Sequence, residues 1–346
     1  MESLDLFSQQ DRNRRRSRWV VAAFIVFFAW LGFGGDFRAW QMTAGADAGS
    51  YHHVVPWFGV LLTAAGGAIA LFAWKNGPGR VLWSASAREV VTPANDLERQ
   101  LVNVVEEMAI ASGLPRPRIW IIPDLDPNAF ATGHDEHDAH VAVTEGLLLA
   151  LDRDELQGVI AHELGHIRNL DVRLMTLLAA LVGAVLLVSD GMGRMMRFGR
   201  LPGGRGGGGG RGRGKNGNPL IVVLLLLWLI SWLLAPLIIR MLSMAVSRNR
   251  EYLADAMSAQ FTRNPLALAS ALEKIEHAPE ATASIKKGSA HLCIADPLGR
   301  RSNLHEGRLA GWFGSHPPMV MRVARLRAMG YQALKREPTT STAIEA

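Results

Sequence analysis

Residues Asp152–Asp171 read DRDELQGVIAHELGHIRNLD and hold His162, Glu163 and His166 in the spacing HExxH. Residues four apart lie on one face of an α-helix, so both imidazoles can point at the same metal ion. Glu163 projects about 100° around the helix from His162, where it can reach a water molecule on that ion. The spacing therefore favours a metal-dependent hydrolase.

The same stretch carries the signals of the helix that this spacing requires. Asp152 can cap the helix, and Glu155, three residues later, completes a capping-box pattern. An apolar stripe follows on one side, formed by Leu156, Val159, Ile160, Leu164 and Ile167. The alternative is a buried amphipathic helix that happens to carry two histidines, because HExxH alone also occurs by chance.

Composition indicates a membrane protein. The chain has 346 residues, of which 49% are hydrophobic, and a formal net charge of +6. The arginines cluster beside apolar runs, which favours anionic lipid headgroups over nucleic acid as the partner. The single cysteine, Cys293, excludes an intramolecular disulfide and any cysteine-based zinc cluster.

Four apolar runs without charged residues are candidates for membrane spans, and they comprise residues 19–34, 54–74, 174–188 and 219–239. A helix needs about 20 residues to cross the apolar layer of a bilayer. The third run, with fifteen residues, is short for a full span unless it extends from the active-site helix. Arginines before the first run predict a cytoplasmic N-terminus, so the first two spans return the chain to the cytoplasm at Lys75.

The Gly/Arg-rich segment 189–218 cannot bury a core, so we expect a flexible loop there. If the third and fourth runs both span, this basic loop lies outside, against the positive-inside rule. A hairpin that dips into the membrane without crossing it is therefore the alternative. RNA binding is not expected, because Phe198 is the loop's only aromatic residue.

Between the second and third runs the chain has the pattern of a soluble α/β segment. Residues 95–112 have helical spacing, and residues 118–122 and 140–143 have the pattern of short strands. Residues 128–133 are expected to form a loop or an edge segment. The histidine and acidic cluster at 134–140 is interpreted as a solvated turn between strands rather than as a metal site.

A third metal ligand is available after the fourth run, where Glu251 and Asp255 lie four residues apart in SRNREYLADAMSAQF. His166 precedes the third run by eight residues, about 12 Å of helix, and Glu251 follows the fourth by twelve, about 18 Å. The two segments therefore lie at similar heights on the same side of the membrane. An exposed acidic pair on a basic helix is the alternative.

Six motifs in a fixed order make the chain resemble the HtpX-like membrane metalloproteases, the branch of HExxH zinc peptidases related to the Ste24 CAAX proteases. The resemblance covers about residues 90–330 and the leading two-span anchor. The motifs are PNAFATG (127–133), VTEGLL (143–148), HELGH (162–166), SRNREYLAD (247–255), HLCIADPL (291–298) and SHPPMVMR (315–322).

The resemblance implies one Zn²⁺ ion per chain, held by His162, His166 and Glu251, with Glu163 as the general base. It also implies that Asp255 orients a ligating histidine.

Three further roles follow from the resemblance. His316 would donate a hydrogen bond in the transition state, and Arg322 would pair with an acidic group. The edge segment formed by Asn128, Ala129, Phe130 and Ala131 would take up a peptide by β-augmentation.

The predicted fold is a membrane protein, mainly α with a small β-sheet, in which a zincin-like α+β catalytic domain is fused to about four transmembrane helices. Its predicted parts are an N-terminal anchor with two transmembrane helices (1–75), a first protease segment with HExxH (76–172), a membrane hairpin with the Gly/Arg-rich loop (173–240), a second protease segment with the third zinc ligand (241–335) and a flexible tail (336–346).

The predicted function is that of an integral membrane zinc endopeptidase that cleaves misfolded or damaged membrane proteins. The resemblance implies a multi-pass protein of the bacterial inner membrane, with its catalytic domain facing the cytoplasm. The expected partners are unfolded or membrane-protein substrates and the lipid bilayer, and the oligomeric state stays open. The alternatives are a prenyl-peptide protease, for which four apolar runs are few, and a catalytically silent scaffold, which predicts a broken ligand or base.

Overall fold

The computed structural model describes residues 6–45, 47, 49–182, 248–278, 284–285, 292–295 and 317–336. These residues divide into two compact units. One unit holds the start of the N-terminal helix as far as Ser17, residues 76–180 and the described residues beyond 247. The other holds Arg18–Lys75 and residues 181–182.

Two described helices are long and apolar enough to cross a membrane, within α1 (Leu6–Thr43) and α2 (Trp57–Ser84). The first helix contains the first predicted run (19–34), and the second contains the second run (54–74) from Trp57 onward. The carboxylate of Asp36 in α1 accepts hydrogen bonds from the backbone N–H groups of Phe58 and Gly59, at 3.0 and 2.5 Å. These donors belong to the first turn of α2, so Asp36 caps that helix.

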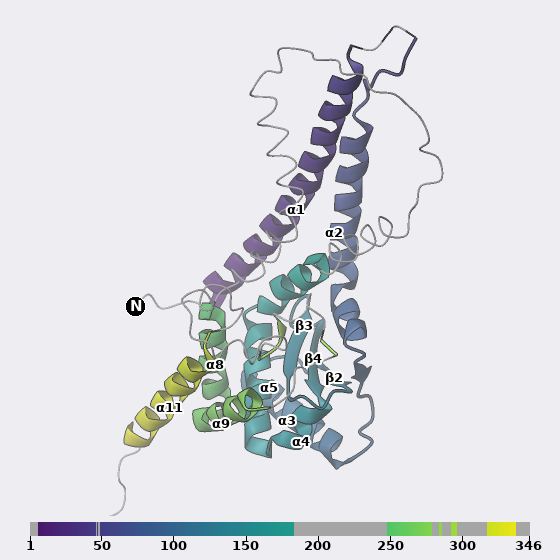
Figure 1. Ribbon diagram of the computed structural model, residues 1–346. Coiled ribbons are helices and arrows are strands. Elements are labelled where there is room, and N and C mark those ends of the chain that lie inside the picture. The colour runs from purple at the N-terminus through teal and green to yellow at the C-terminus, as the bar shows by residue number, and fades with distance from the viewer. Residues whose placement is uncertain are drawn as a thin grey trace, which may run out of the picture. The chain divides into compact units, whose positions relative to one another are not determined.

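The unit with residues 76–180, expected to be catalytic and called the catalytic unit below, contains a small mixed sheet and most of the described helices (Figure 1). The strands are β1 (Arg88–Glu89), β2 (Arg118–Ile122), β3 (Ala129–Gly133) and β4 (Ala139–Thr144). They are arranged in the order β1-β2-β4-β3, with β2 and β4 parallel and the other pairs antiparallel. The predicted strands are confirmed, and β3 lies at one edge of the sheet.

The helices of this unit begin where the sequence places caps. Asn95 caps α3 (Asp96–Ser112), and Thr144 caps α4 (Glu145–Ala150). Asp152 and Glu155 form the predicted capping box of α5 (Arg153–Arg168). The remaining helices are α8 (Arg248–Thr262), α9 (Pro265–Glu276) and α11 (Met319–Arg336).

The active-site helix α5 is buried between the sheet and other helices. Its predicted apolar stripe, from Leu156 to Ile167, lies in the main core. Small residues let its neighbours approach closely. A Cβ atom on Gly165 would lie 3.2 Å from Cα of Ala254 in α8, and Ser258 of α8 donates a hydrogen bond to the carbonyl oxygen of Gly158 at 2.7 Å. This packing brings α8 against the face of α5 that carries the histidines.

The helix with the HExxH motif does not continue into the third apolar run, so such an extension does not explain how that short run could span. It ends at Arg168, Asn169 forms the C-cap, and Leu170 has a left-handed backbone with φ of 56°. Residues 171–182 then form a separate helical segment. A leucine in this conformation costs about 1–2 kcal/mol, and such strain persists only where surrounding structure fixes it. The turn places Asp171 close to His166.

The predicted membrane hairpin lies largely outside the described residues, as do its Gly/Arg-rich loop (189–218) and the C-terminal tail. Only residues 174–182 of the third run are described, and they include the buried side chains of Leu174, Leu177 and Leu178.

Gly146, the second residue of α4, lies against the backbone before β3. A Cβ atom added there would lie 1.9 Å from the carbonyl oxygen of Leu125. The N–H of Gly146 donates to the carbonyl oxygen of Asp124 at 2.9 Å, which holds the two segments together. The glycine of the VTEGLL motif is therefore required by close packing of two backbones.

Gly146→Ala is expected to lower the free energy of unfolding by about 1–3 kcal/mol, the usual cost of overpacking, because backbone atoms must move. Gly79→Ala in α2 is the matched control, since no described atom beyond its own helix lies within 4 Å of the added Cβ. It should leave thermal unfolding unchanged or raise its midpoint. Thermal unfolding in detergent measures both variants. Equal midpoints for Gly146→Ala and the unchanged chain would contradict the close contact.

Candidate metal centre

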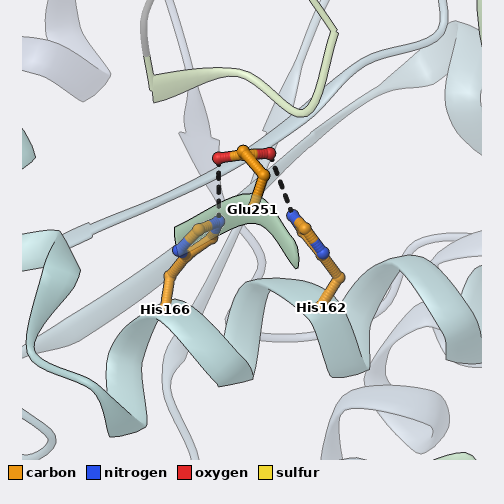
Figure 2. A group of neighbouring side chains, drawn as sticks. All are labelled: His162, His166 and Glu251. Carbon is orange, nitrogen blue, oxygen red and sulfur yellow. Dashed lines mark ion pairs between the residues drawn. The ribbon is translucent and has the colours of Figure 1, made fainter. Parts of the chain in front are cut away.

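Two helices bring three metal-binding side chains together. His162 and His166 project from one face of α5, and Glu251 reaches them from α8 (Figure 2). Oε2 of Glu251 lies 3.7 Å from Nε2 of His162, and Oε1 lies 3.5 Å from Nε2 of His166. One ligand atom from each residue lies within 4.8 Å of the other two, and all three residues are buried.

The donor set and its geometry fit a single zinc ion. Ligand atoms about 2.1 Å from a tetrahedral zinc ion lie about 3.4 Å apart. The nitrogen–oxygen distances of 3.5 and 3.7 Å, each to a different oxygen of Glu251, are close to that separation. Imidazole and carboxylate are ordinary zinc ligands, and three of them leave one position for water. Within the part of the chain that the structure describes, this is the one such group of histidine and acidic side chains.

Glu163 is buried in the same site, close enough to His166 and Glu251 for their charges to affect its pKa. Neither carboxylate oxygen has a hydrogen-bond partner among the described residues, although the residue is only 1% exposed. A buried carboxylate without partners is costly unless water or an ion satisfies it. Burial raises the pKa of Glu163 to about 7, and the charge of Glu251 adds to this effect. Such a carboxylate can exchange a proton near neutral pH.

The far side of His162 is held by a buried ion pair. Oδ1 of Asp255 lies 3.0 Å from Nδ1 of His162, which leaves Nε2 to face Glu251. Arg322 of α11 is fully buried and binds Asp255 through two hydrogen bonds, Nε to Oδ2 at 2.9 Å and Nη2 to Oδ1 at 2.6 Å. Its Nη1 also lies 3.2 Å from Oε2 of Glu251. Arg322 therefore balances the charge of both carboxylates.

The far side of His166 faces a carboxylate that sequence reasoning missed. Oδ2 of Asp171 lies 3.3 Å from Nδ1 of His166, and both residues are buried. Asp171 ends the stretch that opened the sequence analysis, but a continuous helix would turn it away from His166. The turn at Asn169 and Leu170 brings it back. Arg250, next to Glu251, was also missed, and its Nε lies 3.3 Å from Oδ1 of Asp171.

The two histidines differ in their electrostatic surroundings. Burial lowers the pKa of His162 to about 4, against the effect of the hydrogen bond that its Nδ1 donates to Asp255. Burial alone would lower the pKa of His166 too, but Asp171 and Glu251 outweigh it and raise the pKa to about 9. Without a metal, the negative charge around His166 therefore draws a proton into the site. A bound cation would satisfy the same charge.

The residues expected to bind substrate lie at the edge strand. Ala129, Phe130 and Ala131 belong to β3 and Asn128 precedes it, and all four are buried. Residues 292–295 run along part of the outer edge of this strand. The N–H of Ile294 donates to the carbonyl oxygen of Ala129 at 2.9 Å. The side chain of Asn128 donates to the carbonyl oxygen of Ala295 at 3.1 Å. Asn128 therefore holds an internal segment of the chain.

Two other predictions concern His316 and the histidine and acidic cluster at 134–140. His316 lies outside the described residues. Residues 134–138 of the histidine and acidic cluster form the turn between β3 and β4, where Nδ1 of His134 pairs with Asp138 at 2.6 Å, whereas His140 is buried in β4. His137 is exposed in that turn, in keeping with the interpretation as a solvated turn.

The arrangement identifies the class of protein first. Two histidines one helical turn apart, with a glutamate between them and a carboxylate ligand from a second helix, form the site of HExxH metallopeptidases. In that class the metal ligands face one ion and the glutamate of the motif acts on a water molecule.

Comparison with known proteins then gives the family. A sequence model described as Peptidase family M48 matches residues 95–330, and the chain belongs to this family. A protease HtpX homolog of Lactobacillus helveticus is 36% identical over 94% of this chain and 100% of its own length. One from Listeria monocytogenes is 38% identical, with the same coverage of 94% and 100%. One from Thermoanaerobacter pseudethanolicus is 38% identical over 95% of this chain and 99% of its own.

Among solved structures, Ste24p of S. mikatae is similar with a TM-score of 0.41 and 16% sequence identity, covering 94% of this chain and 66% of that one. The resemblance to HtpX-like proteases is confirmed by the family match and the relatives. Together with the two apolar helices, they make the chain a membrane metalloprotease.

Proposed function

We propose that this protease is a zinc endopeptidase of the bacterial inner membrane that cleaves misfolded or damaged membrane proteins. One observation carries the proposal: the buried ligand atoms of His162, His166 and Glu251 converge beside the buried Glu163 carboxylate. One zinc ion per chain, held by those three residues, would supply Lewis-acid polarisation of the scissile carbonyl and make a water molecule more acidic.

In the proposed reaction, Glu163 takes a proton from the attacking water and passes it to the leaving amine. Its burial beside the three proposed ligands supports this role, because a general base must lie within reach of the proton that it takes. Asp255 holds the tautomer of His162 through Nδ1, and Arg322 keeps Asp255 in place. His316 is proposed to donate a hydrogen bond to the oxyanion.

The substrate is proposed to lie as an extended strand beside β3, where backbone hydrogen bonds carry the affinity and many sequences are accepted. Support comes from the packing of β3 against α5, since Ala129 and Ala131 lie in the same core as the apolar stripe of that helix. The carbonyl oxygen of Ala129 already accepts a hydrogen bond from the N–H of Ile294. We therefore propose that the substrate enters at the Ala131 end of the edge, with Asn128 holding residues 292–295 beside it.

The chain is proposed to cross the membrane four times, in the two helices of the anchor (1–75) and in a hairpin (173–240). The protease segments (76–172 and 241–335) would then face the cytoplasm, followed by a flexible tail (336–346). Support comes from the arginines that precede the first apolar run, since basic residues favour the cytoplasmic side.

Cleavage of one protein in two states tests the proposed substrate class. The full chain, purified in detergent with zinc, is given native α-lactalbumin and the same protein after reduction and alkylation. A prenylated C-terminal peptide is offered in parallel. Internal cleavage of the unfolded form, at least about 10-fold faster than of the native form, is expected, because only an extended chain can pair with β3. Cleavage of the prenylated peptide alone would contradict the proposal, and binding without cleavage would indicate a scaffold.

A further inference from the structure

The N-terminal helix contributes a side chain to the buried network behind His166. Asn13 of α1 is 2% exposed. Its side-chain Nδ2 donates to Oδ1 of Asp171 at 2.8 Å and to the carbonyl oxygen of Asn169 at 2.9 Å. Oδ2 of the same Asp171 carboxylate lies 3.3 Å from Nδ1 of His166. A continuous path of polar contacts therefore joins Asn13 to the imidazole that faces Glu251.

One side of this helix is buried at its start, and Asn13 lies on that side. Asn13 and Ser17 are buried and lie four residues apart, whereas the arginines around them are exposed: Arg12, Arg14, Arg15 and Arg16. Burying an amide costs free energy unless its hydrogen bonds are made. The side-chain amide of Asn13 makes two, both to the turn that follows α5. The basic run therefore contains an inward-facing polar contact as well as surface charge.

The two oxygens of the Asp171 carboxylate contact different partners. Oδ1 accepts a hydrogen bond from Nδ2 of Asn13 at 2.8 Å and lies 3.3 Å from Nε of Arg250. Oδ2 faces His166. When a carboxylate holds one ring nitrogen of a ligating histidine, it fixes the tautomer and direction of the other nitrogen. A change at Oδ1 that lets the carboxylate rotate would therefore release the imidazole of His166 as well.

We propose that Asn13 is a positioning residue of the metal centre, because it holds Asp171 so that Asp171 orients His166 toward the zinc ion. The inference rests on the zinc site proposed above. It makes the start of the N-terminal helix, which continues into the first apolar run, part of the catalytic unit. The affinity for zinc then depends on this helix being in place.

Release of zinc to a chelator tests the inference in the full chain in detergent. Loss of a hydrogen-bond partner of a metal ligand typically weakens metal binding 10–100-fold. Asn13 acts one contact further away, so Asn13→Ala is expected to release zinc about 3–10-fold faster. Gln10→Ala is the matched control. Gln10 lies one turn earlier in α1 and donates to the carbonyl oxygen of Arg168 at 2.7 Å, so its loss removes a contact with α5 without cutting the path to His166.

A spectroscopic readout separates positioning from general stability. With cobalt(II) in place of zinc, the visible absorption bands report the ligand geometry. They are expected to shift in Asn13→Ala and to match the unchanged chain in Gln10→Ala. Asn13→Leu, which is similar in size but cannot donate, gives the same comparison if alanine loosens the packing too far. In an Asp171→Ala chain, Asn13→Ala should add no further effect, because the path is already cut.

Unchanged release rates and spectra in Asn13→Ala and Asn13→Leu would overturn the inference, as would an equal effect of Gln10→Ala. An undiminished effect of Asn13→Ala in the Asp171→Ala chain would also overturn it. If the unchanged chain bound no zinc, the proposed function itself would fail, which distinguishes the two failures.

Discussion

Glu163→Gln will stop proteolysis and leave zinc bound. Glutamine keeps the size of the side chain but cannot accept a proton from the attacking water. The carboxylate makes no hydrogen bond with the described residues, so the substitution breaks no such contact in the fold. General bases contribute about 10²–10⁴-fold to a rate, and kcat is expected to fall by that factor. The measurement is cleavage of an unfolded protein, together with zinc content per chain.

The same variant should change stability in a pH-dependent way when the metal is absent. Burial raises the pKa of Glu163 from 4.5 to about 7, so the folded chain disfavours the charged form. The carboxylate therefore costs no stability below about pH 4.5 and costs the most above about pH 7. Glu163→Gln should unfold at a higher temperature than the unchanged chain at pH 8, with the difference vanishing near pH 4.

Retention of proteolysis in Glu163→Gln would exclude Glu163 as the general base.

Glu251→Ala will lose zinc rather than only slow the reaction. It removes the carboxylate whose Oε1 lies 3.5 Å from His166 and whose Oε2 lies 3.7 Å from His162, and would leave two imidazoles to hold the ion. Loss of a ligand should weaken zinc binding by more than about 100-fold, beyond the usual effect of losing a partner of a ligand. The buried Arg322 also loses one of its two acidic neighbours.

Zinc per chain after exposure to a chelator measures this effect. Glu273→Ala is the matched control, because Glu273 lies on α9 and pairs with Arg327 on the surface. Its loss should leave zinc content unchanged. Full zinc occupancy in Glu251→Ala would exclude Glu251 as a ligand. Zinc loss in both variants would point to general unfolding instead.

Much of the catalytic helix could be predicted because its signals are local. The cap at Asp152, the capping box with Glu155 and the apolar stripe all act within four residues, and the structure contains them. The candidate ligand Glu251 was predictable for a similar reason, since Glu251 and Asp255 repeat the four-residue spacing of the histidines.

The interruption after α5 could not be predicted from the same patterns. The apolar spacing continues through Leu170, and both helical segments are buried, so periodicity gives no sign of a break. The left-handed leucine at position 170 is set by tertiary packing rather than by its own preference. Asp171 was missed as a partner of His166 because its direction depends on that turn.

Contacts between distant parts of the sequence explain the other omissions. Asn13 sits in a run of arginines that predicts membrane orientation, and its partner Asp171 lies 158 residues later. Asn128 matches a substrate-binding motif, but its side chain binds Ala295, 167 residues away. Local patterns identify such residues as unusual without revealing what they contact.

Zinc titration of the metal-free chain tests the central claim most directly. The full chain is stripped of metal in detergent, and cleavage of an unfolded protein is followed as zinc is added. We expect no cleavage before zinc and a linear rise that ends at one zinc ion per chain, with no rise in Glu163→Gln at any zinc level. Full activity in the stripped chain, or a rise that Glu251→Ala reproduces unchanged, would contradict a zinc site built from His162, His166 and Glu251.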